Sequence, residues 1–172
     1  DLAQQKFVSP SKYLFLLNYG RIYNDDNVLE HVKNTIDIIA SSGLNDFIEG
    51  GFYRYTIDSE WKIPHFEKML YDQAQMISLY SLAYKVYGDE SYKEVIDQTI
   101  SFLNSKMSSE NGLYFAAMDA DTDGEEGKYY SYTLEELKKI SENTDQKLFN
   151  SYYNIDQANP WENNRFLLLP NK

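Results

Sequence analysis

One helical couplet occurs twice in this chain, and this repeat constrains the fold more than any other feature of the sequence. A segment that is apolar on almost all sides comes first, at residues 12–23 and again at residues 71–87. An acidic turn and a segment with a single apolar face follow each of them. A shift of 64 positions aligns the two copies and pairs Tyr23 with Tyr87. The chain is therefore expected to be built from repeated helical hairpins.

The two kinds of helix predict two layers. A helix without a polar face is buried on every side, whereas an amphipathic helix covers a core on one side only. The apolar face of the second amphipathic helix is predicted to carry Tyr92, Ile96, Ile100 and Leu103, and the repeat pairs Ile36 with Ile100. An inner ring inside an outer ring is the pattern of solenoids and closed α/α toroids.

Short segments of glycine and aromatic residues end the two couplets, at residues 50–55 and 112–115. Their alternation predicts small β-hairpins at one end of the helices. A third, shorter couplet follows, which opens on a capping box of Thr133 and Glu136. We therefore predict an all-α fold, an incomplete (α/α)6 toroid of about three hairpins in one domain, residues 1–172. The hairpins are expected at about 9–49, 63–110 and 133–154, with an apolar edge where the ring stays open.

The charge balance excludes several classes of function. Sixteen Lys and Arg against 27 Asp and Glu give a formal net charge of -11, so neither nucleic acid nor an anionic membrane is an expected partner. The sequence contains no apolar stretch of about 18 residues, which is the length that could span a bilayer. The chain has no Cys, which removes disulfides and thiolate chemistry and is typical of a reducing cytoplasm. No signal-peptide pattern opens it, and we expect a cytoplasmic protein.

The densest group of reactive side chains surrounds His65. Pro64 suits the first position of a helix, which predicts His65 in the first turn, on one face with Lys68 and Asp72. Glu67 and Tyr71 would share the neighbouring face. A helix N-terminus favours the neutral imidazole that a general base requires. The structural alternative is a histidine in a buried polar network.

A second group is the acidic segment 119–129. Asp119, Asp121 and Asp123 copy the start of a calcium loop, but Tyr130 occupies the twelfth position, where an EF-hand needs a bidentate Glu. Calcium in another geometry, paired carboxylates acting on a glycoside, and a solvated acidic turn remain the three interpretations. We expect no metal or other cofactor, with calcium at this loop as the alternative.

Arg54 forms a third candidate, with Tyr53 and Tyr55 on alternate sides. Its guanidinium suits a carboxylate, a carbonyl oxygen or a pair of hydroxyls, or it pairs with the acidic segment. His31 lies within an amphipathic pattern between Glu30 and Val32, and is interpreted as a surface residue.

Three motifs in order, 50–55, 64–72 and 119–129, closely resemble the YyaL-type family, which includes spermatogenesis-associated protein 20. The resemblance implies an α/α toroid similar to N-acylglucosamine 2-epimerases and six-hairpin glycosidases, of which this chain would be the first part. It also implies an N-terminal thioredoxin-like domain in the full-length protein. The Cys motif of that domain has no counterpart here, so no redox activity is carried over.

Two hypotheses follow. In the first, the toroid is an enzyme, an epimerase-like isomerase or a glycosidase-like hydrolase, that acts on a sugar-like compound. His65 is its base or acid, with Glu67 and Lys68 as further catalytic residues. In the second, a non-catalytic toroid binds a ligand or protein partner beside the thioredoxin-like domain. The remainder of the ring, and self-association through the apolar edge, are further expected contacts. The predicted substrate-binding residues are Tyr53, Arg54, Trp61, Tyr71, Asp72, Asp119, Asp121 and Glu126.

Overall fold

The computed structural model describes residues 5–153, 155 and 160–171. It divides into two compact units, Asp1–Met118 and Asp119–Lys172. Residue 154, the predicted end of the third couplet, lies outside the described residues. No helix in the described ranges has both the length and the apolar character needed to cross a membrane.

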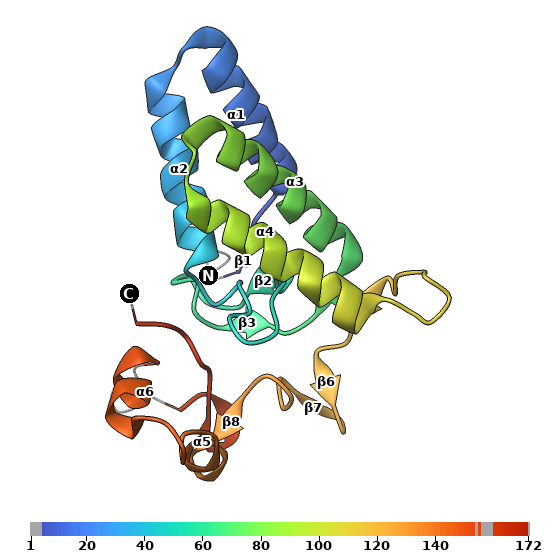
Figure 1. Ribbon diagram of the computed structural model, residues 1–172, viewed down its shortest axis with the longest axis vertical. Helices are drawn as coiled ribbons and strands as arrows, with labels where there is room; N and C mark the ends of the chain where they lie inside the picture. The colour runs from blue at the N-terminus through green and yellow to red at the C-terminus, as the bar shows by residue number, and fades with distance from the viewer. Residues whose placement is uncertain (1–4, 154, 156–159, 172) are drawn as a thin grey trace. The chain divides into compact units, whose positions relative to one another are not determined.

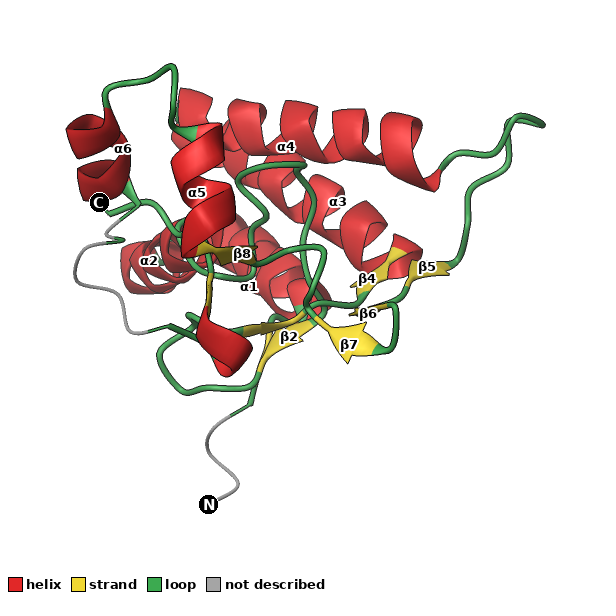
Figure 2. Ribbon diagram, turned by 90° about the horizontal axis from the view of Figure 1, so that it is seen from below, coloured by secondary structure: helices red, strands yellow, loops and turns green. Residues whose placement is uncertain are grey.

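Two helical hairpins form most of the first unit (Figure 1). They consist of α1 (Pro10–Tyr23) with α2 (Asp26–Ala40), and α3 (Leu70–Tyr87) with α4 (Glu90–Phe102). The two helices that are apolar on most sides, α1 and α3, pack against each other, and each also packs against its amphipathic partner. Figure 2 shows α3 and α4 side by side from another direction. The predicted couplets are therefore present, with the apolar helix first in each.

The acidic turns between the helices act as caps. Asn24 and Gly88 end α1 and α3 with left-handed backbone conformations, at φ 51° and 68°. Asp25 then accepts a hydrogen bond from the Val28 N–H, and Asp89 accepts one from the Ser91 N–H. Each aspartate thus satisfies an N–H group that the first turn of a helix leaves without a partner. The turn residues repeat at 64 positions, as the sequence predicts.

The buried faces repeat differently. Val32, Ile36 and Ile39 are buried in α2, and the buried positions of α4 include Val95, Thr99 and Phe102, each 63 residues later. Ile100 is 41% exposed, so the predicted core face of α4 is wrong at this position, whereas Tyr92, which was also predicted, is buried. Large aromatic rings decide the orientation of α4, because Tyr92 packs against Tyr80 in the core and Phe102 is fully buried. Counted from its N-cap aspartate, α4 therefore buries positions one residue earlier than those that α2 buries.

Helix α1 is covered on part of its circumference only. Leu17 and Gly20 are buried, whereas Phe15, Ile22 and Tyr23 are 66%, 70% and 68% exposed. Burial of this helix on every side is therefore wrong for this chain. The predicted apolar edge is present, because nothing in the described first unit covers this side of α1.

A small sheet lies at one end of the hairpins (Figure 1). Strand β2 (Tyr55–Thr56) pairs antiparallel with β1 (Lys6–Phe7) and with β3 (Pro64–His65), and β4 (Lys68–Met69) pairs with β5 (Ala117–Met118). Pro64 therefore does not begin a helix, and α3 starts at Leu70 instead. Strand β3 is an edge strand, where a proline without an N–H group is tolerated. The predicted helical face shared by His65, Lys68 and Asp72 does not exist.

The glycine–aromatic segments close short hairpins, as predicted. Single antiparallel bridges join Asn45 to Phe52 and Ser108 to Tyr114. Gly51 has a φ of 78°, and a Cβ atom there would lie 2.6 Å from the ring of Phe102. Glycine is required at this position for both reasons. The π-helical turn η1 (Leu103–Met107) connects α4 to the short hairpin that the Ser108–Tyr114 bridge closes.

The second unit contains short elements around a small core. The capping box of Thr133 and Glu136 opens α5 (Leu134–Ile140), as predicted, and Phe166 and Leu168 pack with Leu137. The elements are β6 (Asp121–Thr122), β7 (Glu125–Glu126), β8 (Tyr132–Thr133), α5 (Leu134–Ile140), α6 (Gln146–Tyr152), η2 (Glu162–Asn164) and β9 (Arg165–Phe166). Strand β6 pairs with β7, and β8 pairs with β9.

Candidate functional site

A cavity of about 250 Å³ opens in the first unit, beside the first turns of α1 and α3. Its apolar wall includes Phe7 and Val8 near β1 and Met76 on α3. Polar groups gather on the remaining wall, and most of them belong to segments that the sequence singled out. The polar and phenolic lining residues are Ser9, Tyr53, Arg54, Tyr71, Asp72 and Gln75. An apolar cavity with a few convergent polar groups is the usual form of a small-molecule site.

Asp72 is the most perturbed carboxyl group of this cavity. It lies in the first turn of α3, and its Oδ2 atom is buried without a hydrogen-bond partner among the described residues. Burial raises the pKa of Asp72 from 3.8 to about 6, and the nearby Glu67 carboxylate acts in the same direction. The Arg54 guanidinium opposes this rise in pKa, but it does not overcome the loss of hydration.

Arg54 and Glu67 form an ion pair at the cavity. The Nη1 atom of Arg54 lies 2.9 Å from Oε2 of Glu67, and the Arg54 N–H donates to the Glu67 carbonyl oxygen at 2.9 Å. The hydrogen bond that Arg54 donates to the Glu67 carboxylate is the main reason why the pKa of Arg54 is raised. Both side chains keep partial exposure, at 40% and 26%, so the guanidinium remains accessible to a ligand.

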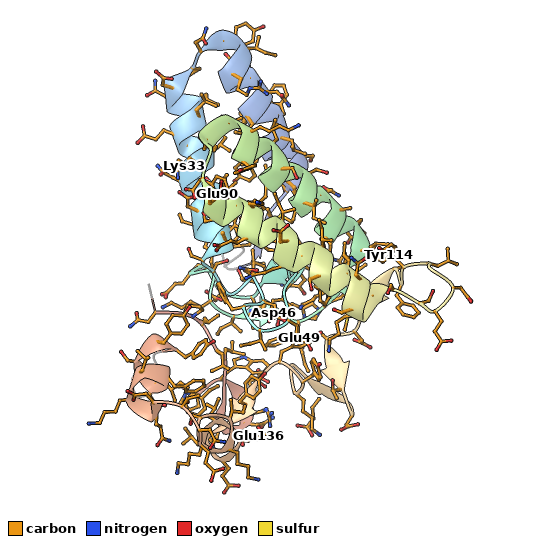
Figure 3. All side chains as sticks on the ribbon, in the orientation of Figure 1. Lys33, Asp46, Glu49, Glu90, Tyr114 and Glu136 are labelled. Atoms are coloured by element: carbon orange, nitrogen blue, oxygen red, sulfur yellow. The ribbon has the colours of Figure 1, made fainter. Side chains whose placement is uncertain are left out.

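Lys68 is buried beneath the loops and does not line the cavity. Its side chain is 0% exposed, and its Nζ atom donates to Asp46 Oδ2 at 2.6 Å and to the Gly50 carbonyl oxygen at 2.9 Å. The ammonium group also lies over the rings of Tyr53 and Phe102. Burial lowers the pKa of Lys68 and the Asp46 carboxylate partly offsets this. Figure 3 shows Asp46 among the loops at the lower end of the helices. This geometry is that of a structural lysine.

His65 and Trp61 are also absent from the cavity wall. His65 lies on β3 and stacks on Tyr55 with ring centroids 4.9 Å apart. Contrary to the prediction, His65 does not lie at a helix N-terminus, because α3 begins five residues later at Leu70. Trp61 lies in the loop before β3, and its carbonyl oxygen accepts a hydrogen bond from the Gly43 N–H at 2.7 Å. His31 is exposed on α2, as predicted.

Two tyrosines flank the carboxyl and guanidinium groups. Tyr71 precedes Asp72 on α3 and is 46% exposed, so its ring is available to a ligand. Tyr53, which also lines the cavity, is only 7% exposed, and its ring packs edge-on against Phe66. The structure thus brings together four predicted residues, Tyr53, Arg54, Tyr71 and Asp72, with Glu67 as the partner of Arg54.

The acidic residues Asp119, Asp121 and Glu126 belong to the second unit, and all three are exposed. Asp121 pairs with Glu126 across the β6–β7 hairpin, and the Asp121 N–H donates to Asp119 Oδ1 at 3.3 Å. Lys128 forms ion pairs with Asp123 and Glu125. No group of three or more His, Asp or Glu side chains in the described residues is arranged to hold a metal ion.

Two buried polar residues that support the site were not predicted. Gln73 is 0% exposed, accepts a hydrogen bond from the Phe52 N–H and donates one to the Phe52 carbonyl oxygen, each at 2.7 Å. Asp46 accepts from the N–H groups of Ile48 and Glu49 and from Lys68. Gln73 could have been recognised in the sequence, because it is an amide side chain within a mostly apolar helical segment.

Comparison with known proteins places the chain in a family. No profile of a known protein family matches it. Human spermatogenesis-associated protein 20 is 35% identical over 145 residues, which cover 78% of this chain and 18% of the human protein. The chain belongs to the spermatogenesis-associated protein 20 family. It spans about a fifth of the length of this relative, and the predicted resemblance is confirmed.

Solved structures confirm the fold. A sugar epimerase from a ruminal bacterium superimposes with a TM-score of 0.62 at 20% identity, over 91% of this chain and 46% of the epimerase. A family 76 glycoside hydrolase from a bovine Bacteroides thetaiotaomicron strain superimposes with a TM-score of 0.54 at 18% identity. The superposition covers 65% of this chain and 23% of the hydrolase. The chain is a mainly helical, partial α/α toroid, as the sequence predicts.

Proposed function

We propose that this segment supplies part of a sugar-binding site to a carbohydrate-processing toroid, and that Asp72 transfers a proton there. One observation carries the proposal, namely the buried and unsatisfied carboxyl oxygen of Asp72 in a cavity of about 250 Å³. Structural neighbours that are a sugar epimerase and a glycoside hydrolase support a sugar as the ligand.

The pKa of Asp72 suits proton transfer near neutral pH. At a pKa of about 6, the carboxylate predominates at neutral pH, and a useful fraction stays protonated. As a base, the carboxylate would remove a proton beside an open-chain carbonyl group. As an acid, the carboxyl group would protonate a glycosidic oxygen. In the reaction with the carbonyl compound, Arg54 would bind the carbonyl oxygen, on which negative charge develops. In either reaction, Tyr71 would contact the sugar ring.

This proposal gives His65 and Lys68 other roles than the sequence did. Lys68 holds the loop at Asp46, because its ammonium group is enclosed and reaches no solvent. His65 stays outside the cavity lining, on the stack with Tyr55. Asp72 is the group in the cavity whose pKa fits the acid–base role.

The second candidate is a toroid that binds a ligand without turnover, beside a thioredoxin-like domain. The internal pairing of Arg54 with Glu67 favours it, since a guanidinium already neutralised contributes less to a transition state. The two candidates differ in outcome, because only the first converts the sugar that it binds.

The test uses the full-length protein, incubated in deuterated water with a panel of aldoses, ketoses and glycosides. We expect one class of sugar to be converted, and Asp72→Asn to abolish the conversion. Asp97→Asn, the same chemical change on the exposed face of α4, is the matched control and should leave it intact. Deuterium beside the carbonyl carbon would identify an isomerase, and a released sugar would identify a hydrolase.

The pH profile then assigns the role of Asp72. If the carboxylate is the base, kcat/KM rises with pH through about 6, and if the carboxyl group is the acid, it falls through the same value. Sugar binding without any conversion would favour the second candidate. Conversion that survives in Asp72→Asn would remove Asp72 from the mechanism.

A further inference from the structure

Three aromatic rings from three strands form a stack at the edge of the cavity. The ring centroids of Phe7 and Tyr55 are 4.6 Å apart with an angle of 27° between the ring planes, and those of Tyr55 and His65 are 4.9 Å apart at 19°. The register of the sheet produces this stack, since Phe7 lies opposite Tyr55 and Tyr55 lies opposite His65. We call these three residues the aromatic stack.

The aromatic stack is continuous with the cavity through Phe7. Phe7 lines the cavity beside Arg54 and Asp72, and it is also the first ring of the stack. It remains 53% exposed although it is one of the larger apolar side chains of the unit. Tyr55 and His65 are partly exposed as well. An apolar surface that begins inside a polar-lined cavity and continues outside it is suited to a ligand longer than the cavity.

The size of the cavity limits what it can enclose. Its volume of about 250 Å³ is below the roughly 300–1,000 Å³ of pockets that surround a drug-sized ligand. One sugar ring is of a size to fit such a space, and a second ring would have to lie outside it. Pyranose rings carry C–H groups on their faces, which pack well against the electron-rich faces of aromatic side chains.

We propose that the aromatic stack is a second sugar-binding subsite, so that the substrate is a disaccharide or a longer glycan rather than a free monosaccharide. This inference rests on the proposed function. The ring that reacts lies in the cavity at Asp72, and the next ring of the glycan lies against Phe7 and the stack behind it. Phe7 is then a specificity-determining residue that contacts both sugar rings.

The experiment compares sugars of different length on the full-length protein by calorimetry. The probes are the pairs glucose with cellobiose and mannose with mannobiose. In at least one pair, the disaccharide is expected to bind about tenfold more tightly than its monosaccharide. Phe7→Leu keeps the apolar volume but removes the aromatic face, and it should weaken disaccharide binding about threefold to tenfold. The same substitution should leave monosaccharide binding within about twofold.

Phe115→Leu is the matched control, because Phe115 is also 53% exposed but lies outside the stack and the cavity lining. Equal affinity for both members of each pair would overturn the second subsite and leave the proposed function intact. So would a loss in Phe7→Leu that affects monosaccharide and disaccharide equally. If no sugar of either length binds to the wild type, the proposed function and this inference both fail.

Discussion

Replacing Asp72 by Asn should make the protein more stable at neutral pH while it abolishes activity. In the wild type, the folded state must hold a carboxylate in a place that disfavours its charge, since burial raises its pKa from 3.8 to about 6. The side-chain amide of Asn has nearly the same shape and no charge. The substitution therefore removes an electrostatic penalty from the folded state and leaves the unfolded state almost unchanged.

The size and sign of the effect follow from this shift in pKa. A rise of about two units corresponds to about 3 kcal/mol for a fully enclosed group. Asp72 is half-buried, and solvent screening reduces the effect on the free energy of unfolding to about 1 kcal/mol. The folded state keeps its proton up to about pH 6, whereas the unfolded chain loses it near 3.8. Wild-type stability attributable to this group therefore falls as the pH rises between these values.

Urea unfolding followed by circular dichroism measures the difference between the two proteins. Asp72→Asn should be more stable than the wild type by about 1 kcal/mol at pH of about 8, and equal to it at pH of about 3. Asp97→Asn, on an exposed surface, should show no such pH-dependent difference. A variant that is less stable than the wild type at neutral pH would refute the reasoning, because it would show that the Asp72 carboxylate is stabilised in the fold.

Three further changes test other contacts of the first unit. Lys68→Met should lower the free energy of unfolding by about 3–5 kcal/mol, since it leaves the buried Asp46 carboxylate unpaired, and Asp46→Leu in the same chain should restore much of it. Gly43→Ala should cost about 3 kcal/mol in urea unfolding, because its Cβ would lie 1.9 Å from the Lys62 carbonyl oxygen. Asp89→Ala should cost about 1 kcal/mol as a lost helix cap, and a similar value is expected at the equivalent cap of α2. An unchanged free energy of unfolding in urea for any of the three variants would contradict the corresponding contact.

The local sequence pattern was sufficient to predict the helices and their order. Caps such as Asp89 and the box at Thr133 act within a few residues, so their effect can be read without knowing the fold. The double glycine before Phe52 likewise predicts a tight hairpin from backbone preferences alone. Hydrophobic periodicity then divided the helices into two layers, because burial follows the 3.6-residue period of the helix.

Contacts between distant segments decided what the sequence could not. Pro64 is compatible with a helix start and with an edge strand, and pairing with Tyr55 and Thr56 selects the strand. Ile100 and Thr99 have neighbouring positions on α4, and the packing of Tyr92 and Phe102 puts the smaller, polar residue in the core. In both cases, the free energy of tertiary packing exceeds the local preference.

The chemistry of the candidate site depends on tertiary structure even more strongly. The sequence identified Asp72, Arg54 and Lys68 as polar groups near one another along the chain. Their roles separate only in the fold, where Lys68 is enclosed by Asp46 and Gly50 while Asp72 borders an open cavity. A pKa depends on hydration and on charges in three dimensions, and those are set by segments far apart in the sequence.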